Sequence, residues 1–110
     1  MNLPNRENAY VSPEKLIDYL LSESHPVGGS KARYLRTTGF DDTNMDLLQE
    51  GLLTIARMFE VQNIFSIPYG EKFVIEGEML APNGNFIRLR TVWIIDKGQD
   101  RPRFVTAYPE

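Results

Sequence analysis

Cysteine is absent from the 110-residue sequence, and histidine occurs only once, at His25. Without cysteine the chain has no disulfide framework, no thiolate nucleophile and no cysteine-ligated zinc or iron–sulfur site. The single histidine likewise excludes a metal site built from several histidines. We therefore expect a protein that works with no metal and no cofactor.

Long apolar runs are also missing, and no stretch is long enough to span a bilayer. The first ten residues lack the apolar centre of a signal peptide. The composition, 42% hydrophobic and 25% charged, is typical of a globular protein and excludes a disordered or fibrous chain. We expect one small cytoplasmic domain spanning residues 1–110, with no membrane contact.

Positive charge is in slight deficit, because the net charge is −3, and this argues against bulk non-specific binding of nucleic acid. The cations are nevertheless gathered in two stretches, residues 25–40 and 84–106. These stretches either meet in space as one cationic face or form separate solvated surfaces. Their members are Lys31, Arg33 and Arg36 in the first, and Arg88, Arg90, Lys97, Arg101 and Arg103 in the second.

The amino-terminal half predicts helices. Residues 1–11 are polar and predict an extended arm, and residues 12–60 predict a helical part. Ser12 as N-cap before Pro13 predicts a helix that runs to about Ser22. Ser30 predicts a second N-cap, for a short helix over residues 31–38 closed by Gly39. The apolar face of the first helix is expected to hold Leu16, Ile17, Leu20 and Leu21.

The third helix has the clearest periodicity. Asp42 or Thr43 is expected to cap it, and capping explains Asp41 and Asp42 better than metal binding does. Gly51 in mid-helix costs about 1 kcal/mol against alanine, which is compatible with close packing at that point. The apolar face of this helix comprises Met45, Leu48, Leu52, Ile55 and Phe59.

Beyond residue 60 the apolar period changes to two, which predicts strands over residues 64–67, 71–80, 85–96 and 103–108. Asn83-Gly84 is typical of a tight turn between two antiparallel strands. Helices followed by an antiparallel meander define an α+β fold. We expect two or three N-terminal helices packed on a C-terminal antiparallel sheet of three or four strands, which covers residues 61–110.

His25 is the natural candidate for proton transfer, because its unperturbed pKa lies near neutrality. The glycines that follow it, Gly28 and Gly29, lead into the helix start at Ser30, where backbone N–H groups beside Lys31 suit a phosphate. The alternative is that the glycines make a turn, the serine caps a helix and the histidine bonds a carbonyl.

The sheet supplies a second set of candidates. Thr91, Trp93, Thr106 and Tyr108 are expected to share one face, where hydroxyls bind phosphate and aromatic rings stack on bases. The alternative for Trp93 is a place in the core. For metal-free RNA cleavage, His25 would act as the base or the acid. Lys31, Thr106 and Tyr108 would share the remaining catalytic roles, and the cations would stabilise the phosphorane. The expected substrate-binding residues are Gly28, Gly29, Ser30, Arg33, Arg90, Trp93 and Arg103.

Several motifs resemble an uncharacterised bacterial domain family. Its pattern comprises a Lys-x-x-x-Tyr-Leu-Leu helix, a His-Pro-x-Gly-x-x-Lys-Ala segment, a Trp-containing strand and a final Pro-Arg-x-Val-Thr-Ala-Tyr-Pro. The corresponding stretches here are Lys15–Leu21, His25–Ala32, Thr91–Ile95 and Pro102–Pro109. The likeness extends over nearly the whole chain.

The family's order of helices and strands is similar to that of the barnase–EndoU–colicin–RelE group of metal-independent ribonucleases, which includes toxin modules of bacterial conflict systems. That resemblance implies an RNA-cleaving toxin-type domain, with RNA as substrate and an antitoxin or immunity protein as partner. It implies catalytic roles for His25, Lys31, Thr106 and Tyr108. The alternative is a non-catalytic module that binds protein through a strand edge or a sheet face.

Overall fold

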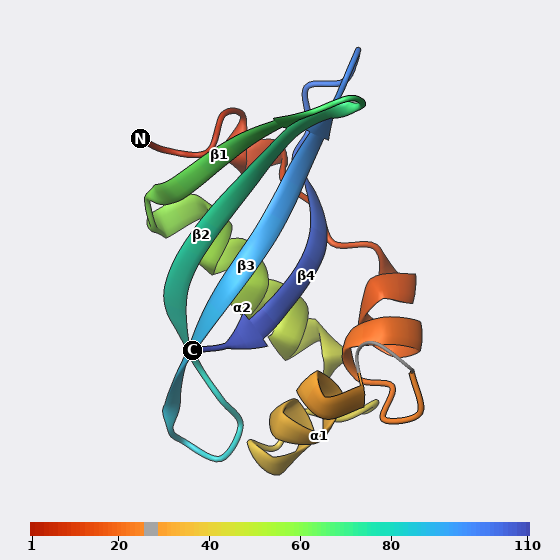
Figure 1. Ribbon diagram of the computed structural model, residues 1–110. Helices are drawn as coiled ribbons and strands as arrows, with labels where there is room; N and C mark the ends of the chain where they lie inside the picture. Colours follow the sequence, from red (N-terminus) through yellow and green to blue (C-terminus); the bar gives the residue numbers. More distant parts are fainter. Residues whose placement is uncertain (26–28) are drawn as a thin grey trace.

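A computed structural model describes residues 1–25 and 29–110. Helical segments come first and a four-stranded antiparallel sheet follows, which confirms the predicted α+β fold (Figure 1). None of the helices within these residues is long and apolar enough to cross a membrane. The elements are η1 (Arg6–Asn8), η2 (Lys15–Leu20), α1 (Gly29–Thr37), α2 (Met45–Met58), β1 (Val61–Ile67), β2 (Gly70–Leu80), β3 (Phe86–Asp96) and β4 (Arg103–Pro109).

The sheet is a simple meander in which each strand pairs with the next, in the order β1-β2-β3-β4. Helix α2 crosses behind the strands in Figure 1 and packs on one face of the sheet. That face carries apolar residues that alternate along β2 and β3 with the predicted period of two, including Phe73, Ile75 and Trp93. The two longest strands, β2 and β3, therefore occur where the sequence predicted them, because a strand with one buried face alternates apolar and polar residues in its sequence.

The predicted third helix is confirmed as α2, and Leu48, Leu52 and Ile55 lie fully buried on its inner face. Its N-cap is Asn44, not Asp42 or Thr43. The Asp41 carboxylate accepts hydrogen bonds from the backbone and hydroxyl of Thr43 and so forms its own turn before the helix. These two bonds also lower the pKa of the Asp41 carboxyl.

The first eleven residues are not the extended arm that their polarity suggested. Leu3, Ala9 and Val11 are buried in the core. Tyr10 forms a parallel bridge with Arg103: its N–H donates to the Pro102 carbonyl just before β4, and its carbonyl accepts from the N–H of Phe104 in β4. The amino terminus therefore covers part of the free edge of β4, a pairing that local composition does not reveal.

The first helix begins at Pro13 as predicted, but from Lys15 to Leu20 it is wound as a π-helix. The backbone N–H of Leu21 donates to the carbonyl of Leu16, five residues earlier. This wider turn leaves Ile17 46% exposed, so the prediction that Ile17 belongs to the apolar face was wrong. Such turns are uncommon and frequently occur at functional sites.

Helix α1 begins at Gly29, so Ser30 lies inside its first turn and is not the N-cap that the sequence suggested. The helix ends at Thr37 and is closed, as predicted, by Gly39, whose φ of 105° is readily adopted only by glycine. Residues 26–28, which include the candidate Gly28, lie outside the described residues.

Strand β4 contains the irregularity that matters most for the site. Val92 pairs with Thr106 but Trp93 pairs with Phe104, so Val105 is an extra residue. Phe104 and Ala107 consequently face the core, whereas Thr106 and Tyr108 face the opposite side, with Val92 and Arg90. The prediction that Thr91, Trp93, Thr106 and Tyr108 share one face was therefore wrong, because a two-residue period does not survive an inserted residue.

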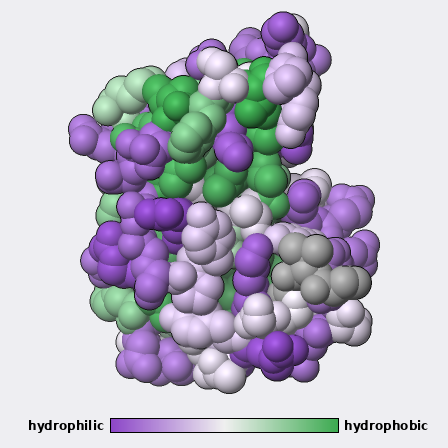
Figure 2. Space-filling view, in the orientation of Figure 1, coloured by the Kyte–Doolittle hydropathy of each residue, from purple (hydrophilic) through white to green (hydrophobic). Residues whose placement is uncertain are grey.

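The face opposite α2 is called here the outer face, and its three central residues, Val74, Val92 and Ile94, are buried apart from the main core. Figure 2 views the molecule from this side and shows apolar surface gathered over the sheet in its upper half. The outer face therefore combines an apolar centre with the hydroxyls that β4 turns outward.

Candidate functional site

Three elements bring polar side chains together where η2 and α1 pack against β4. The Lys31 ammonium donates to the Tyr19 hydroxyl at 2.8 Å and to the Thr106 hydroxyl at 3.1 Å. The two hydroxyl oxygens lie 2.8 Å apart and share a hydrogen bond. All three residues are half-buried, so the group is ordered by the fold and still reachable from solvent.

Two further candidates lie against this group. The His25 ring contacts the Tyr19 ring edge to face, with centroids 5.0 Å apart and an interplanar angle of 88°. The Lys31 ammonium lies 5.6 Å from the centroid of the Tyr108 ring. We call Tyr19, His25, Lys31, Thr106 and Tyr108 the Tyr19 cluster. The structure thus brings together the four residues predicted as catalytic, and Tyr19 joins them.

Two ammonium groups face the Tyr19 ring, since Lys15 lies 5.1 Å and Lys31 5.3 Å from its centroid. Burial by itself raises the pKa of the Tyr19 phenol. The hydrogen bonds with Lys31 and Thr106, together with the charges of Lys31 and Lys15, outweigh burial and lower the pKa below 10.0. The cluster therefore favours negative charge on this oxygen.

Arg90 extends the cationic surroundings of the cluster along β3. It pairs across the sheet with Tyr108, and its guanidinium lies 3.5 Å from a Glu76 carboxylate oxygen. Hydrogen bonding to Tyr108 and the charge of Glu76 raise the pKa of Arg90. Glu76 in turn hydrogen-bonds Glu110, which raises the pKa of the Glu110 carboxyl. Tyr108 thus contacts two cations, Lys31 and Arg90.

The candidates at the start of α1 have separate places. Gly29 is buried, and a Cβ there would lie 2.6 Å from the carbonyl oxygen of Glu23, so the close approach of the two backbones requires glycine. Ser30 and Arg33 are exposed on α1 near Lys31.

Trp93 is completely buried, makes an edge contact with Phe104 and donates its indole N–H to the Thr91 hydroxyl at 2.8 Å. This placement corrects the interpretation of Trp93 as a base-stacking residue, because no face of its ring reaches the surface. The alternative of a core position is what the structure shows. The Thr91 hydroxyl donates a hydrogen bond to the Ile75 carbonyl, so the buried indole N–H and the buried hydroxyl both have a partner.

Arg103 is not part of the cluster. It forms a two-pronged pair with Asp96, with N–O distances of 2.7 and 3.2 Å. This bond lowers the pKa of the Asp96 carboxyl and raises that of the Arg103 guanidinium. Of the predicted cations, Lys31 therefore lies within the cluster and Arg90 beside Tyr108, whereas Arg103 is engaged with Asp96 at the start of β4.

Sequence reasoning missed Tyr19. Two features pointed to it: the spacing of four residues from Lys15, which places both on one helical face, and the presence of both in the Lys-x-x-x-Tyr-Leu-Leu motif. Its distant partner Thr106 lies 87 residues away, so only the tertiary structure reveals the contact.

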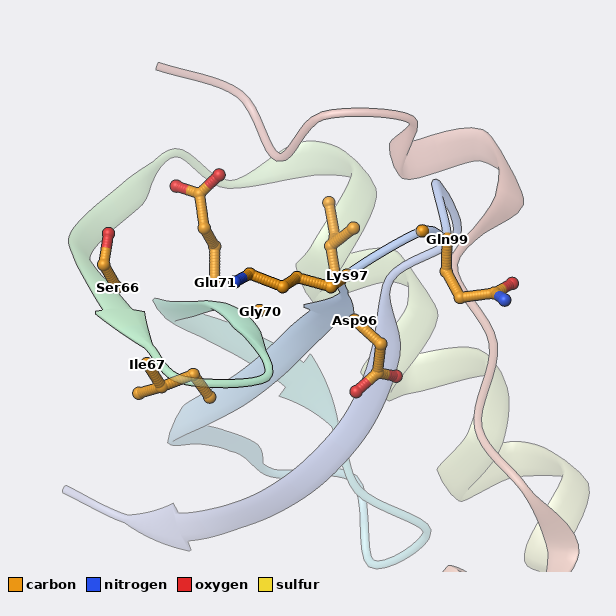
Figure 3. Close-up of a pocket in the computed structure, with 9 residues that line it drawn as sticks. Ser66, Ile67, Gly70, Glu71, Asp96, Lys97 and Gln99 are labelled. Atoms are coloured by element: carbon orange, nitrogen blue, oxygen red, sulfur yellow. The ribbon is translucent and has the colours of Figure 1, made fainter.

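A pocket of about 540 Å³ lies at the other end of the sheet, where the β1–β2 turn meets the residues that follow β3 (Figure 3). Its charged side chains diverge: Glu71 and Asp96 point to different sides, and Lys97 extends toward β2 (Figure 3). None of the Tyr19 cluster lines it. Among the described residues, no three histidine or acidic side chains are grouped closely enough to hold a metal ion.

Comparison with known proteins identifies the family. The model of the family described as "Domain of unknown function (DUF6883)" matches residues 2–110. The chain belongs to this family. This agrees with the resemblance to an uncharacterised domain family that the motifs indicated. No curated protein matches the chain.

The fold recurs in a solved structure. A chain in the contact-dependent growth inhibition toxin–immunity protein complex from Klebsiella pneumoniae 342 superposes on this one with a TM-score of 0.75. The two chains are 20% identical, and the alignment covers 96% of each. At this identity the likeness shows a common fold.

Proposed function

We propose that this protein is a metal-independent ribonuclease of the toxin type, which cleaves RNA by attack of a 2′-hydroxyl on the adjacent phosphate. The observation that carries the proposal is the Tyr19 cluster. Four residues singled out from separate parts of the sequence for this chemistry meet within one group, although His25 and Tyr108 are 83 positions apart. Convergence of this kind is the geometric requirement for joint action on one phosphate.

The residues supply the parts that this reaction needs. His25 carries an imidazole, the side-chain type best suited to exchange protons near neutral pH. Lys31 carries the positive charge that stabilises a phosphorane, and the hydroxyls of Thr106 and Tyr108 are donors for its oxygens. The 2′-hydroxyl attacks, a 2′,3′-cyclic phosphate forms and the 5′-oxygen leaves. No step requires a metal ion.

RNA binding is assigned to groups that surround the cluster. Arg33 is exposed on α1, and Arg90 lies beside Tyr108. Ser30 and Gly29 provide the start of α1, whose backbone N–H groups suit a phosphate. Because the net charge of the protein is negative, we expect RNA to bind only at these cations around the cluster. The protein should therefore bind a short stretch of RNA.

The structural neighbour supports a place in bacterial competition, because that structure is a complex of a toxin with its immunity protein. By analogy, this protein has an immunity protein or an antitoxin as partner and acts on RNA in the cytoplasm. The shared fold supports the role and leaves the activity to be measured.

The alternative function is that of a non-catalytic module that binds protein. Strand β1 favours it, because residues 62–66 are all exposed at the sheet edge and carry no charge. Ile64 and Phe65 are 43% and 48% exposed. Natural edge strands are usually protected by charge or proline, and an unprotected one can pair with a partner's strand.

The deciding experiment is incubation of the purified protein with total RNA and with tRNA in excess EDTA. We expect cleavage that leaves 2′,3′-cyclic phosphate ends and that is lost in His25→Ala. Tyr69→Phe is the matched control, because Tyr69 is exposed at the far end of the sheet. Thermal melting of each variant separates loss of catalysis from loss of folding.

Absence of cleavage by the wild-type protein at high concentration would refute the ribonuclease and favour the binding module. Full activity in a correctly folded His25→Ala variant would remove His25 from the mechanism.

A further inference from the structure

We propose that Tyr19 is the general base of the reaction: its phenolate oxygen takes the proton of the attacking 2′-hydroxyl, and His25 protonates the leaving 5′-oxygen. This inference rests on the proposed ribonuclease function and assigns its two proton-transfer roles. It follows from the contacts of Tyr19, whose hydroxyl bonds both Lys31 and Thr106 and whose ring contacts His25 and Lys15.

The hydrogen atoms of the cluster can be counted. Lys31 donates to both hydroxyl oxygens, and one of the two hydroxyls donates to the other. The Tyr19–Thr106 pair therefore has one hydrogen left over when both residues are neutral. When Tyr19 is ionised, Thr106 donates inward and the phenolate oxygen accepts from both partners. The contacts are thus fully compatible with an anion on Tyr19, and they leave it further lone-pair capacity for a substrate proton.

The charges around Tyr19 favour the same state. Lys15 from its own helix and Lys31 from α1 face its ring, and His25 contacts the ring from the segment before α1. Strand β4 contributes the Thr106 hydroxyl to the oxygen and the Tyr108 ring on the far side of Lys31. Among the described residues no carboxylate hydrogen-bonds the phenol, and the pKa of the phenol is lowered. A lowered pKa raises the fraction of base present at neutral pH.

The reaction then balances without a co-reactant. The 2′-oxygen forms a bond to phosphorus as its proton passes to the Tyr19 oxygen. The bond from phosphorus to the 5′-oxygen breaks as the His25 imidazolium gives that oxygen a proton. Lys31 remains charged throughout and stabilises the phosphorane and the phenolate in turn. Exchange of one proton each with water restores both residues.

An activated substrate separates the base from the acid. In a nucleoside 3′-(4-nitrophenyl phosphate) the leaving nitrophenolate needs no protonation, whereas the 2′-hydroxyl still needs a base. We expect Tyr19→Phe to lose about 100-fold or more in kcat/KM on both RNA and this substrate. His25→Ala should lose a similar factor on RNA and recover most of it on the activated substrate. Tyr69→Phe should match the wild type on both.

The reverse pattern, in which Tyr19→Phe recovers and His25→Ala does not, would overturn the assignment and make His25 the base. Wild-type levels of activity in Tyr19→Phe on both substrates would exclude Tyr19 from the chemistry while the ribonuclease function stood. Failure of the wild-type protein to cleave either substrate would instead refute the proposed function itself.

A titration that needs no activity completes the test. The near-ultraviolet phenolate absorbance of the wild-type protein, minus that of Tyr19→Phe, reports the ionisation of Tyr19 alone. We expect a midpoint below the ordinary tyrosine pKa and a shift upward in Lys31→Met, with an unchanged midpoint in Lys97→Met. A midpoint at or above the ordinary value would contradict a phenolate base.

Discussion

At the scale of single residues, Lys31 holds the candidate site together. Its ammonium bonds hydroxyls from η2 and β4 while its backbone belongs to α1. We predict that Lys31→Met lowers RNA cleavage about 100- to 1,000-fold, because the variant keeps the aliphatic bulk and loses the charge next to the phosphate.

The melting temperature of Lys31→Met should change by only a few degrees, because the ammonium is half-buried and the remaining hydroxyls still bond each other. Lys97→Met, on an exposed lysine outside the cluster, is the control and should preserve cleavage. A collapse of thermal stability in Lys31→Met would identify Lys31 as a structural residue.

The pair of Asp96 and Arg103 gives a prediction that depends on pH. Arg103 lowers the pKa of Asp96 below its unfolded value, so the pair stabilises the protein above that value and loses the effect as pH falls through the lowered pKa. Arg103→Met should therefore reduce the free energy of unfolding by up to about 1 kcal/mol at neutral pH.

The difference between Arg103→Met and the wild type should disappear in strong acid, once Asp96 is protonated in both. Denaturant unfolding at a series of pH values measures it. Asp96→Asn should show the same cost, and the double variant should add little. A difference that persists unchanged in acid would mean that Arg103 stabilises through packing alone.

At the scale of elements, two irregularities place the site. The π-turn of η2 changes which residues face the core, and the extra residue in β4 turns Thr106 and Tyr108 outward. If β4 had no extra residue, the Thr106 and Tyr108 hydroxyls would not lie on the outer face with Arg90. Irregular turns and bulges re-aim side chains, and here both meet at the Tyr19 cluster.

The contact of α2 with the sheet offers a test of stability at this scale. A Cβ on Gly77 of β2 would lie 2.9 Å from the Phe59 ring and 3.0 Å from the Ile55 side chain. We predict that Gly77→Ala destabilises the fold by about 1 to 3 kcal/mol, measured by urea unfolding, because these groups are packed and cannot move freely.

The smaller side chain in Gly77→Ala/Phe59→Leu should recover part of the lost stability. RNA cleavage by the folded fraction of Gly77→Ala should equal that of the wild type, since neither partner belongs to the Tyr19 cluster. A stabilising Gly77→Ala would show that α2 can shift away from the sheet.

At the scale of the whole molecule, the charge distribution limits the binding expected for the proposed RNA substrate. The net charge is −3, and the cations near the cluster that are assigned to RNA are Lys31, Arg33 and Arg90. We predict that log Kd for a non-cleavable single-stranded oligonucleotide rises with log salt with a slope of about 2 or less, at about 0.7 per phosphate contact.

Fluorescence anisotropy at several salt concentrations measures this slope. Arg33→Gln should reduce it by about 0.7, and Arg101→Gln, whose guanidinium lies over the Tyr10 ring, should leave it unchanged. A steep slope in the wild type would indicate a long basic binding surface that these cations do not provide.

The predictable parts of the structure are those in which burial repeats with a regular period. Helix α2 and strands β2 and β3 showed their buried faces in the sequence, since each has one face on the core. The prediction failed for Ile17 and for the side to which the β4 residues point. It assumed the regular periods of 3.6 residues for a helix and two for a strand, and these periods do not reveal a π-turn or a bulge. Trp93 was compatible with a base-stacking role and with a core position, and only its contacts in the folded protein decided between them.

The sequence by itself determined the α+β class, the absence of cysteine chemistry and a set of candidate residues for proton transfer and phosphate binding that did not include Tyr19. Local spacing and side-chain chemistry are sufficient for these conclusions. Only the tertiary structure decided which candidates meet, because the contacts of Tyr19 and Lys31 with Thr106 join residues 87 and 75 positions apart. The pairing of distant residues depends on how whole elements pack, and at this site it depends on one inserted residue in β4.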